Sequence, residues 1–195
     1  MSKISSPEAL SALIRSRRSI YPAMYTDEPI DEAIIKEMLE NANWAPNHKK
    51  TEPWRFKVYR GAARQRLADW LSSTYKNKVS AEDFSEKKFK KLSTNSIKSD
   101  TVIAIIMQRH PDNLLPEWEE IAAMSMAVQN LWLTATAYGL GGYWGSPALL
   151  AAAGDFMNLK EGERCYGIFF LAHYQAHERV GQRKDINDKV EWISE

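Results

Sequence analysis

The longest helical pattern of the chain is EWEEIAAMSMAVQNLWLTATAY, at residues 117–138. Ala, Met and Leu make this stretch apolar nearly all round, and such a helix is buried on most sides. Gly139 follows directly, which is typical of a helix end. We therefore predict a long central buried helix, around which the other elements pack.

Shorter apolar runs on both sides of this helix predict strands. Residues 101–107 form a β-branched run of strand length, as expected for a strand buried on both faces. Residues 166–173 form a second buried run, and residues 55–60 alternate apolar and charged side chains like a half-buried strand. Helices and strands mix without strict βαβ alternation, internal repeats or linkers, so we predict one α+β domain over residues 1–195.

Helical patterns cover much of the remaining chain. Ser6-Pro7-Glu8 is a helix start, and a second helix begins at Asp31 and ends before Pro46. A third helix is predicted over residues 62–73. Residues 75–100 contain seven Lys and four acidic residues with few large apolar side chains, so we expect a mobile, solvated helix or lid there.

The composition gives no global attraction to nucleic acid or to anionic membranes. The 195 residues include 26 Lys and Arg against 25 Asp and Glu, a net charge of +1. No stretch approaches the roughly 18 uninterrupted apolar residues of a membrane span, and the N-terminus lacks the apolar region of a signal peptide. The single Cys165 fits a reducing compartment. We expect a cytoplasmic protein with no nucleic-acid or membrane partner.

Several kinds of site are disfavoured by missing motifs. The sequence has neither the G-x-S-x-G motif of serine hydrolases nor a phosphate-binding P-loop. Its histidines show no paired spacing on one helix, which disfavours a metal site. They are His48, His110, His173 and His177.

The first segment that could carry chemistry is Arg15-Ser16-Arg17-Arg18-Ser19. Three guanidiniums within four positions repel one another unless an anion lies among them, and Arg offers paired hydrogen bonds to phosphate. Cations at a helix C-terminus are the structural alternative, because the helix dipole favours them there by about 0.3–1 kcal/mol. The residues alone leave both interpretations open.

Two further segments could bind a ligand. Residues 44–54 are predicted to form a loop in which Pro46 and Pro53 bracket His48 and its basic neighbours. Residues 139–147, GLGGYWGSP, place four glycines around two aromatic side chains. Glycines permit close approach of the backbone to a flat ring, but a helix end followed by a tight turn explains them equally well. A lone loop histidine is likewise often a hydrogen-bonded turn residue.

Taken in order, these segments resemble the nitroreductase family of FMN-dependent oxidoreductases. The resemblance is carried by Arg17-Arg18-Ser19, by Ala45-Pro46 with Pro53-Trp54 before a strand, and by Gly139-Leu140-Gly141-Gly142-Tyr143-Trp144. The segments Ala-Pro-Asn-His-Lys and Gly-Gly-Tyr-Trp are most similar to the small single-domain branch of that family. The resemblance spans nearly the whole chain.

The resemblance implies a homodimer with a central, mostly antiparallel sheet flanked by helices and with two FMN sites at the subunit interface. It implies that NAD(P)H, either NADH or NADPH, reduces the FMN, which then reduces a small acceptor such as a nitroaromatic or a quinone. The flavin carries the chemistry, so no catalytic side chain is nominated. The implied FMN-binding residues are Arg17, Arg18 and Ser19 for the phosphate, ribityl chain or pyrimidine end, Trp44 and His48 from the other subunit, Tyr143, Trp144 and Gly145 along the ring or ribityl chain, and Arg183 at the phosphate.

Two departures from the family pattern bear on the flavin and substrate contacts. Lys50 and Glu52 stand where many members have Asn and Gln, and residues 172–175 replace the usual Gly-Tyr-Pro. The polar C-terminal tail also regains alternating apolar residues at Val190, Trp192 and Ile193, so we expect it to dock on a partner subunit.

Two other function classes remain open at this point. One is a flavin-binding module for FMN sequestration or sensing, with incidental reductase activity. The other is a nucleic-acid protein that uses the lysines of residues 87–91, although a solvated helix face explains those lysines more simply.

Overall fold

The computed structural model describes residues 6–175 and 180–194 of the chain. Four strands form one sheet in the order β1-β2-β4-β3, and each neighbouring pair runs antiparallel. Central β2 is buried along nearly its whole length, as its β-branched run predicts. The predicted α+β fold with a mostly antiparallel sheet is confirmed. The strands are β1 (Trp54–Tyr59), β2 (Thr101–Gln108), β3 (Gly141–Gly145) and β4 (Glu163–Ala172).

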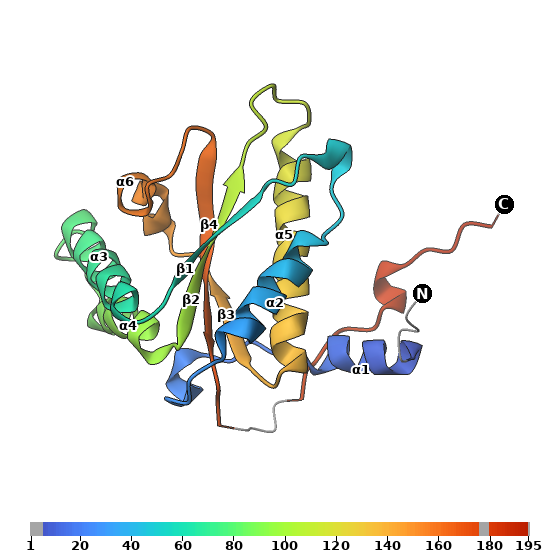
Figure 1. Ribbon diagram of the computed structural model, residues 1–195, viewed down its shortest axis with the longest axis horizontal. Coiled ribbons are helices and arrows are strands. Elements are labelled where there is room, and N and C mark those ends of the chain that lie inside the picture. Colours follow the sequence, from blue (N-terminus) through green and yellow to red (C-terminus); the bar gives the residue numbers. More distant parts are fainter. Residues whose placement is uncertain (1–5, 176–179, 195) are drawn as a thin grey trace.

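Helices α2 (Glu32–Asn43) and α5 (Glu117–Ala137) cover one face of the sheet (Figure 1). Leu131 of α5 and Phe169 of β4 are fully buried in the core cluster between them. The long central helix is therefore confirmed. It ends as predicted, because Gly139 takes a φ of 68°, a conformation that favours glycine.

The other face is covered by α3 (Ala62–Lys78) and α4 (Glu86–Lys98), with the short helices η3 (Ala148–Ala152) and α6 (Gly154–Met157) beside them (Figure 1). Leu71 of α3 is buried in the second core cluster on this face.

Residues 75–100 are largely helical and mostly exposed, as the expected solvated helix would be, but the segment is anchored at a few points. Tyr75 is only 4% exposed, and Ser96 is fully buried. Phe84 packs between Tyr75 and Phe89, with ring centroids 5.5 and 5.7 Å apart. The side chains that pack in this segment include aromatic and small ones and form no long aliphatic run. Its packing could therefore not be predicted from composition. Its role as a lid stays a prediction.

Strand β3 replaces the tight turn that was one of the two alternatives for residues 139–147. Residues 141–145 pair with β4 in a regular antiparallel ladder. A Cβ atom on Gly142 would lie 2.4 Å from the buried ring of Phe169, so close packing inside the fold already requires this glycine.

Helix α1 (Pro7–Ser16) lies at one side of the molecule. The side chain of Ser6 accepts the N–H of Ala9 at 3.1 Å, which confirms the predicted helix start. No residue of α1 is buried, and Leu10 and Ile14 are each 47% exposed. Figure 1 shows α1 and the C-terminal tail on the same side, beyond α5. In the tail, Trp192 is 88% exposed, and docking on a partner subunit stays a prediction. Among the helices that the structure describes, none has the length and hydrophobicity needed to cross a bilayer.

Candidate functional site

The predicted phosphate segment lies in a cavity that we name the basic cleft. The basic cleft has a volume of about 530 Å³. It brings the arginines at the end of α1 together with Arg183 of the C-terminal tail, as the family resemblance implies. Its lining consists of Ile14, Arg15, Arg17, Arg18, Gln129, Gly181 and Arg183.

Backbone geometry at the end of α1 fixes these arginines. Arg17 is the helix C-cap and leaves the helical conformation. A guanidinium nitrogen of Arg18 donates to the carbonyls of Arg15 and Arg17, at 2.7 and 2.8 Å. A Cβ atom on Gly181 would lie 2.3 Å from the Arg18 guanidinium carbon, so the absence of a side chain lets the tail lie against this arginine.

Arg17 is the inner, half-buried guanidinium of the basic cleft. It lies over the Trp132 ring, 4.5 Å from the centroid. Burial lowers its pKa, and the neighbouring charges of Arg183 and Arg18 lower it further, although a guanidinium stays charged at neutral pH. Among the residues that the structure describes, no carboxylate forms an ion pair with Arg15, Arg17 or Arg183. An anion in the cleft would therefore relieve their repulsion.

Ser19 connects the basic cleft to the glycine-rich segment. It forms a parallel bridge with Gly142, and the N–H of Ile20 donates to the Gly142 carbonyl at 3.0 Å. The first and third predicted segments thus lie side by side at the β3 edge of the sheet. Ser19 itself is not among the residues that line the cleft.

Tyr143 and Gly145 line a second cavity of about 350 Å³, on the α4 side of the sheet. Tyr143 stacks on Phe170 with centroids 5.8 Å apart, and Tyr21 packs on it at 4.7 Å. Burial raises the pKa of Tyr143, and Tyr21 raises it further. Lys88, a predicted solvated residue, also lines this cavity.

Trp144 lies on the opposite face and packs against the α5 core cluster. Among the described residues 6–175 and 180–194, neither its buried indole N–H nor that of Trp132 has a hydrogen-bond partner. Such unpartnered buried donors are uncommon in proteins. Trp132 packs beside Gly142 and Trp144 packs beside Gly167, and little space remains at either glycine for a side chain.

Trp44 and His48 are not brought to the basic cleft of their own chain. Trp44 is 78% exposed and donates its indole N–H to Glu40 at 3.0 Å. The His48 ring nitrogen lies 2.8 Å from a carboxylate oxygen of Glu119, at the start of α5. Gln129 of the cleft lies ten residues further along α5, about 15 Å away at about 1.5 Å per residue. Within one chain, Trp44 and His48 therefore lie away from the basic cleft.

The loop that carries His48 has an unusual backbone. Lys49, Lys50 and Glu52 all take positive φ values, at 51°, 54° and 41°. Non-glycine residues seldom adopt this conformation, and it is concentrated at functional sites. Lys50 and Glu52, which form one of the two departures from the family pattern, therefore lie at strained positions.

Five residues of the site were not predicted as binding residues: Ile14, Arg15, Gln129 and Gly181 line the basic cleft, and Trp132 lies under Arg17. Arg15 was part of the arginine segment, but Gln129 and Trp132 come from the central helix, which was interpreted as core. The signal that could have found Gln129 is the polar pair it forms with Asn130 inside an otherwise apolar helix.

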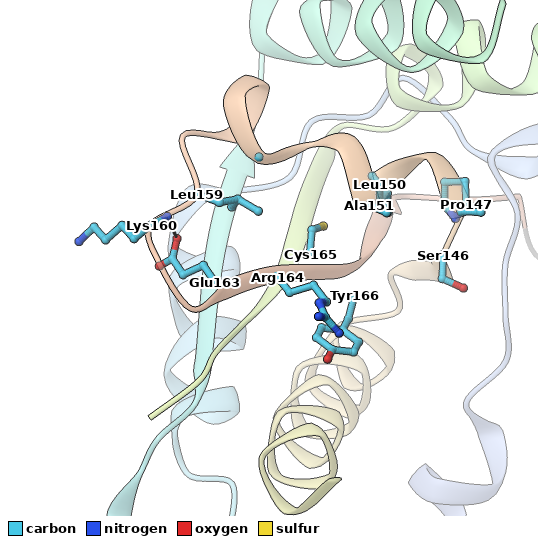
Figure 2. Close-up of a pocket in the computed structure, with 12 residues that line it drawn as sticks. Ser146, Pro147, Leu150, Ala151, Leu159, Lys160, Glu163, Arg164, Cys165 and Tyr166 are labelled. Carbon is cyan, nitrogen blue, oxygen red and sulfur yellow. Dashed lines mark hydrogen bonds between the residues drawn. The ribbon is translucent and has the colours of Figure 1, made fainter. Parts of the chain in front are cut away.

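A larger cavity of about 690 Å³ surrounds the start of β4, where β3 no longer covers the strand (Figure 2). Figure 2 shows Arg164 and Tyr166 side by side, with Cys165 on the opposite side of the strand. Arg164 and Tyr166 both contact Glu117, at 3.4 and 2.9 Å, so the charge of this arginine is already balanced. Burial raises the pKa of the Cys165 thiol. The basic cleft therefore provides the stronger anion site.

The described residues contain no group of three or more His, Cys, Asp or Glu side chains that could hold a metal ion. His177 lies outside the described residues.

Comparisons with known proteins agree with this architecture. The model of the Nitroreductase family matches residues 14–173. The Bacillus subtilis protein named "Putative NAD(P)H nitroreductase YfhC" is 31% identical over 183 residues, which cover 92% of each chain. A crystal structure of a nitroreductase-like family protein from Bacillus cereus has a TM-score of 0.81 at 29% identity, covering 99% of this chain and 98% of that one.

A more distant structure shows the same fold. The FMN-dependent nitroreductase NfnB from Mycobacterium smegmatis, solved in complex with NADPH, has a TM-score of 0.76 at 15% identity. The alignment covers 96% of this chain and 99% of that one. The family match runs from the last turn of α1 to the end of β4, so it includes the whole sheet and three arginines of the basic cleft. The chain therefore belongs to the nitroreductase family.

Proposed function

We propose that this protein is an FMN-dependent oxidoreductase that uses NAD(P)H to reduce small oxidised acceptors such as nitroaromatics or quinones. The observation that carries the proposal is the basic cleft, where four guanidiniums converge beside the edge strand that bears the Gly-Gly-Tyr-Trp segment. The names of the relatives point the same way: YfhC is named as an NAD(P)H nitroreductase, and NfnB is FMN-dependent.

The residues present fit the phosphate end of FMN. Arg17, Arg18 and Arg183 would hold the phosphate, because guanidiniums bind it through charge-assisted hydrogen bonds. The depressed pKa of Arg17 reflects partly the repulsion that a phosphate would cancel. Ser19 lies next to these arginines and is available to the ribityl chain.

The flavin ring would lie along β3, towards Tyr143, Trp144 and Gly145. An extended chain covers the three residues from Arg18 to Tyr21 in about 10 Å, and Tyr21 packs on Tyr143. The ring and the phosphate would thus be bound by one continuous edge of the molecule. The glycines of β3 serve packing within the sheet, so aromatic side chains and backbone groups supply the ring contacts.

Bound FMN supplies the hydride and electron transfer. The chain's own residues would bind and orient it, with the arginines of the basic cleft holding its phosphate. No general acid or base is required of the side chains.

The complete site would need two copies of the chain. Trp44 and His48 lie away from the basic cleft of their own chain, so they would serve the site of the partner. Leu10 and Ile14 of α1 and Trp118 of α5 are exposed apolar side chains that a homodimer would cover. The exposed tail at Trp192 would dock on the partner in the same assembly.

The test is an absorbance spectrum of the purified protein, followed by anaerobic mixing with NADH and with NADPH. A bound flavin spectrum that bleaches within seconds supports the oxidoreductase. A flavin colour that persists for minutes with both nucleotides identifies a flavin-binding module instead. A monomer that takes up no FMN in excess refutes the proposal.

A further inference from the structure

The basic cleft holds more positive charge than one FMN phosphate neutralises. Within the part of the chain that the structure describes, Arg15, Arg17 and Arg183 have no ion-pair partner, and no carboxylate lines the cleft. A phosphate monoester carries about −1.5 to −2 charges at neutral pH. With these three guanidiniums alone, at least about one positive charge remains after FMN binds.

The basic cleft is also larger than a phosphate group. Five heavy atoms, each given the roughly 30 Å³ of a water molecule, occupy about 150 Å³. The cavity measures about 530 Å³. There is room for a second anionic group beside the first.

Arg15 is the exposed guanidinium of the cleft that the proposed phosphate contacts of Arg17, Arg18 and Arg183 leave unused. Arg17 is half-buried over Trp132, whereas Arg15 is exposed on the last turn of α1. The Arg15 carbonyl accepts a hydrogen bond from Arg18, which fixes the backbone while the Arg15 guanidinium lines the cleft. Arg15 is therefore available to a second anionic group.

We propose that Arg15 makes the protein prefer NADPH to NADH by binding the 2′-phosphate, the one group in which the two nucleotides differ. The inference rests on the proposed function, since it concerns the reductant of the same site. The planar guanidinium suits a phosphate because it can donate two parallel hydrogen bonds. Because Arg15 is exposed, the interaction is screened by salt and its contribution is modest.

The test measures binding to the FMN-loaded protein by calorimetry, with 2′,5′-ADP and 5′-AMP as probes that differ only in the 2′-phosphate. At low salt we expect 2′,5′-ADP to bind about five- to tenfold more tightly than 5′-AMP. Arg15→Gln should bring the two affinities to within about twofold, and Arg15→Lys should restore part of the difference. The ratio of kcat/KM for NADPH over NADH should change in parallel.

The matched control is Arg66→Gln, which removes one positive charge from an exposed site on α3. It should leave the preference for 2′,5′-ADP unchanged. Equal binding of both probes by the wild type, or an unchanged ratio in Arg15→Gln, overturns the inference and leaves the proposed function intact. Loss of FMN from Arg15→Gln also overturns it, because Arg15 would then belong to the FMN phosphate site. Wild-type protein that takes up no FMN refutes the proposed function itself.

Discussion

Replacing Arg17 and Arg18 together by alanine removes two of the four guanidiniums that line the basic cleft. A hydrogen bond to a charged group contributes about 1.5–3 kcal/mol, so the loss of one such bond from each arginine weakens FMN binding by about 3–6 kcal/mol. At about 1.4 kcal/mol per tenfold change, the dissociation constant of FMN should rise by roughly 10² to 10⁴. The double variant should therefore be purified as a colourless protein.

The same variant should remain folded. Arg17 contributes a contact with Trp132 worth about 0.5–1 kcal/mol at a partly exposed site, and α1 buries no residue. Circular dichroism should show unchanged secondary structure, while quenching of flavin fluorescence measures the affinity.

The control for this experiment is Arg66→Ala, on a helix that Figure 1 places on the other side of the sheet from α1. It should keep the wild-type affinity for FMN. A double variant that is purified with full flavin, or whose dissociation constant rises by less than threefold, would show that the phosphate lies elsewhere.

Three further predictions concern stability and assembly. Glu120 is fully buried and pairs with Arg109, so Glu120→Gln should destabilise the fold by about 3 kcal/mol and lower the melting temperature by about 6–12 °C. Glu32→Gln, which removes one partner of an exposed pair, should leave the melting temperature unchanged. Equal melting temperatures for the two variants would contradict this prediction. Gly142→Ala should destabilise the fold by about 1–3 kcal/mol, because the added Cβ would clash with Phe169. A Cβ at Gly154 has open space around it, so Gly154→Ala should leave the urea-unfolding midpoint unchanged. Similar midpoints for the two variants would refute the packing argument. Deleting residues 184–195 should weaken the homodimer in analytical ultracentrifugation, and an unchanged dimer constant would reject docking of the tail.

The elements that the sequence predicts well are those with a strong local pattern. Residues 117–138 and 101–107 are apolar in a way that only a buried helix and a buried strand explain, and the structure confirms both. Strand β3 could not be predicted in this way, because its glycines lack strand propensity. Residues 141–145 form a strand because they pair with the distant strand β4, and Gly142 is required by the ring of Phe169 on that strand; the local sequence contains neither.

How well a site residue could be predicted depended on its sequence separation from the residues that it contacts. The arginines within residues 15–18 are close in sequence, so their repulsion suggested an anion site, although a helix C-terminus was an alternative until the family resemblance was added. Arg183 was assigned only through the family resemblance, because no local rule connects the tail to α1. Trp132 is hidden from such reasoning, since an aromatic residue in a buried helix looks like core.

Helix α1 contains no buried residue, and the C-terminal tail lies against the end of α1 at Gly181 and Arg183. The end of α1 and the start of the described tail therefore meet at one spot, where guanidiniums gather. A ligand that binds only the assembled form stabilises it by mass action. FMN bound in this cleft would then hold α1 and the tail together, so limited proteolysis near Gly181 should slow as FMN is added.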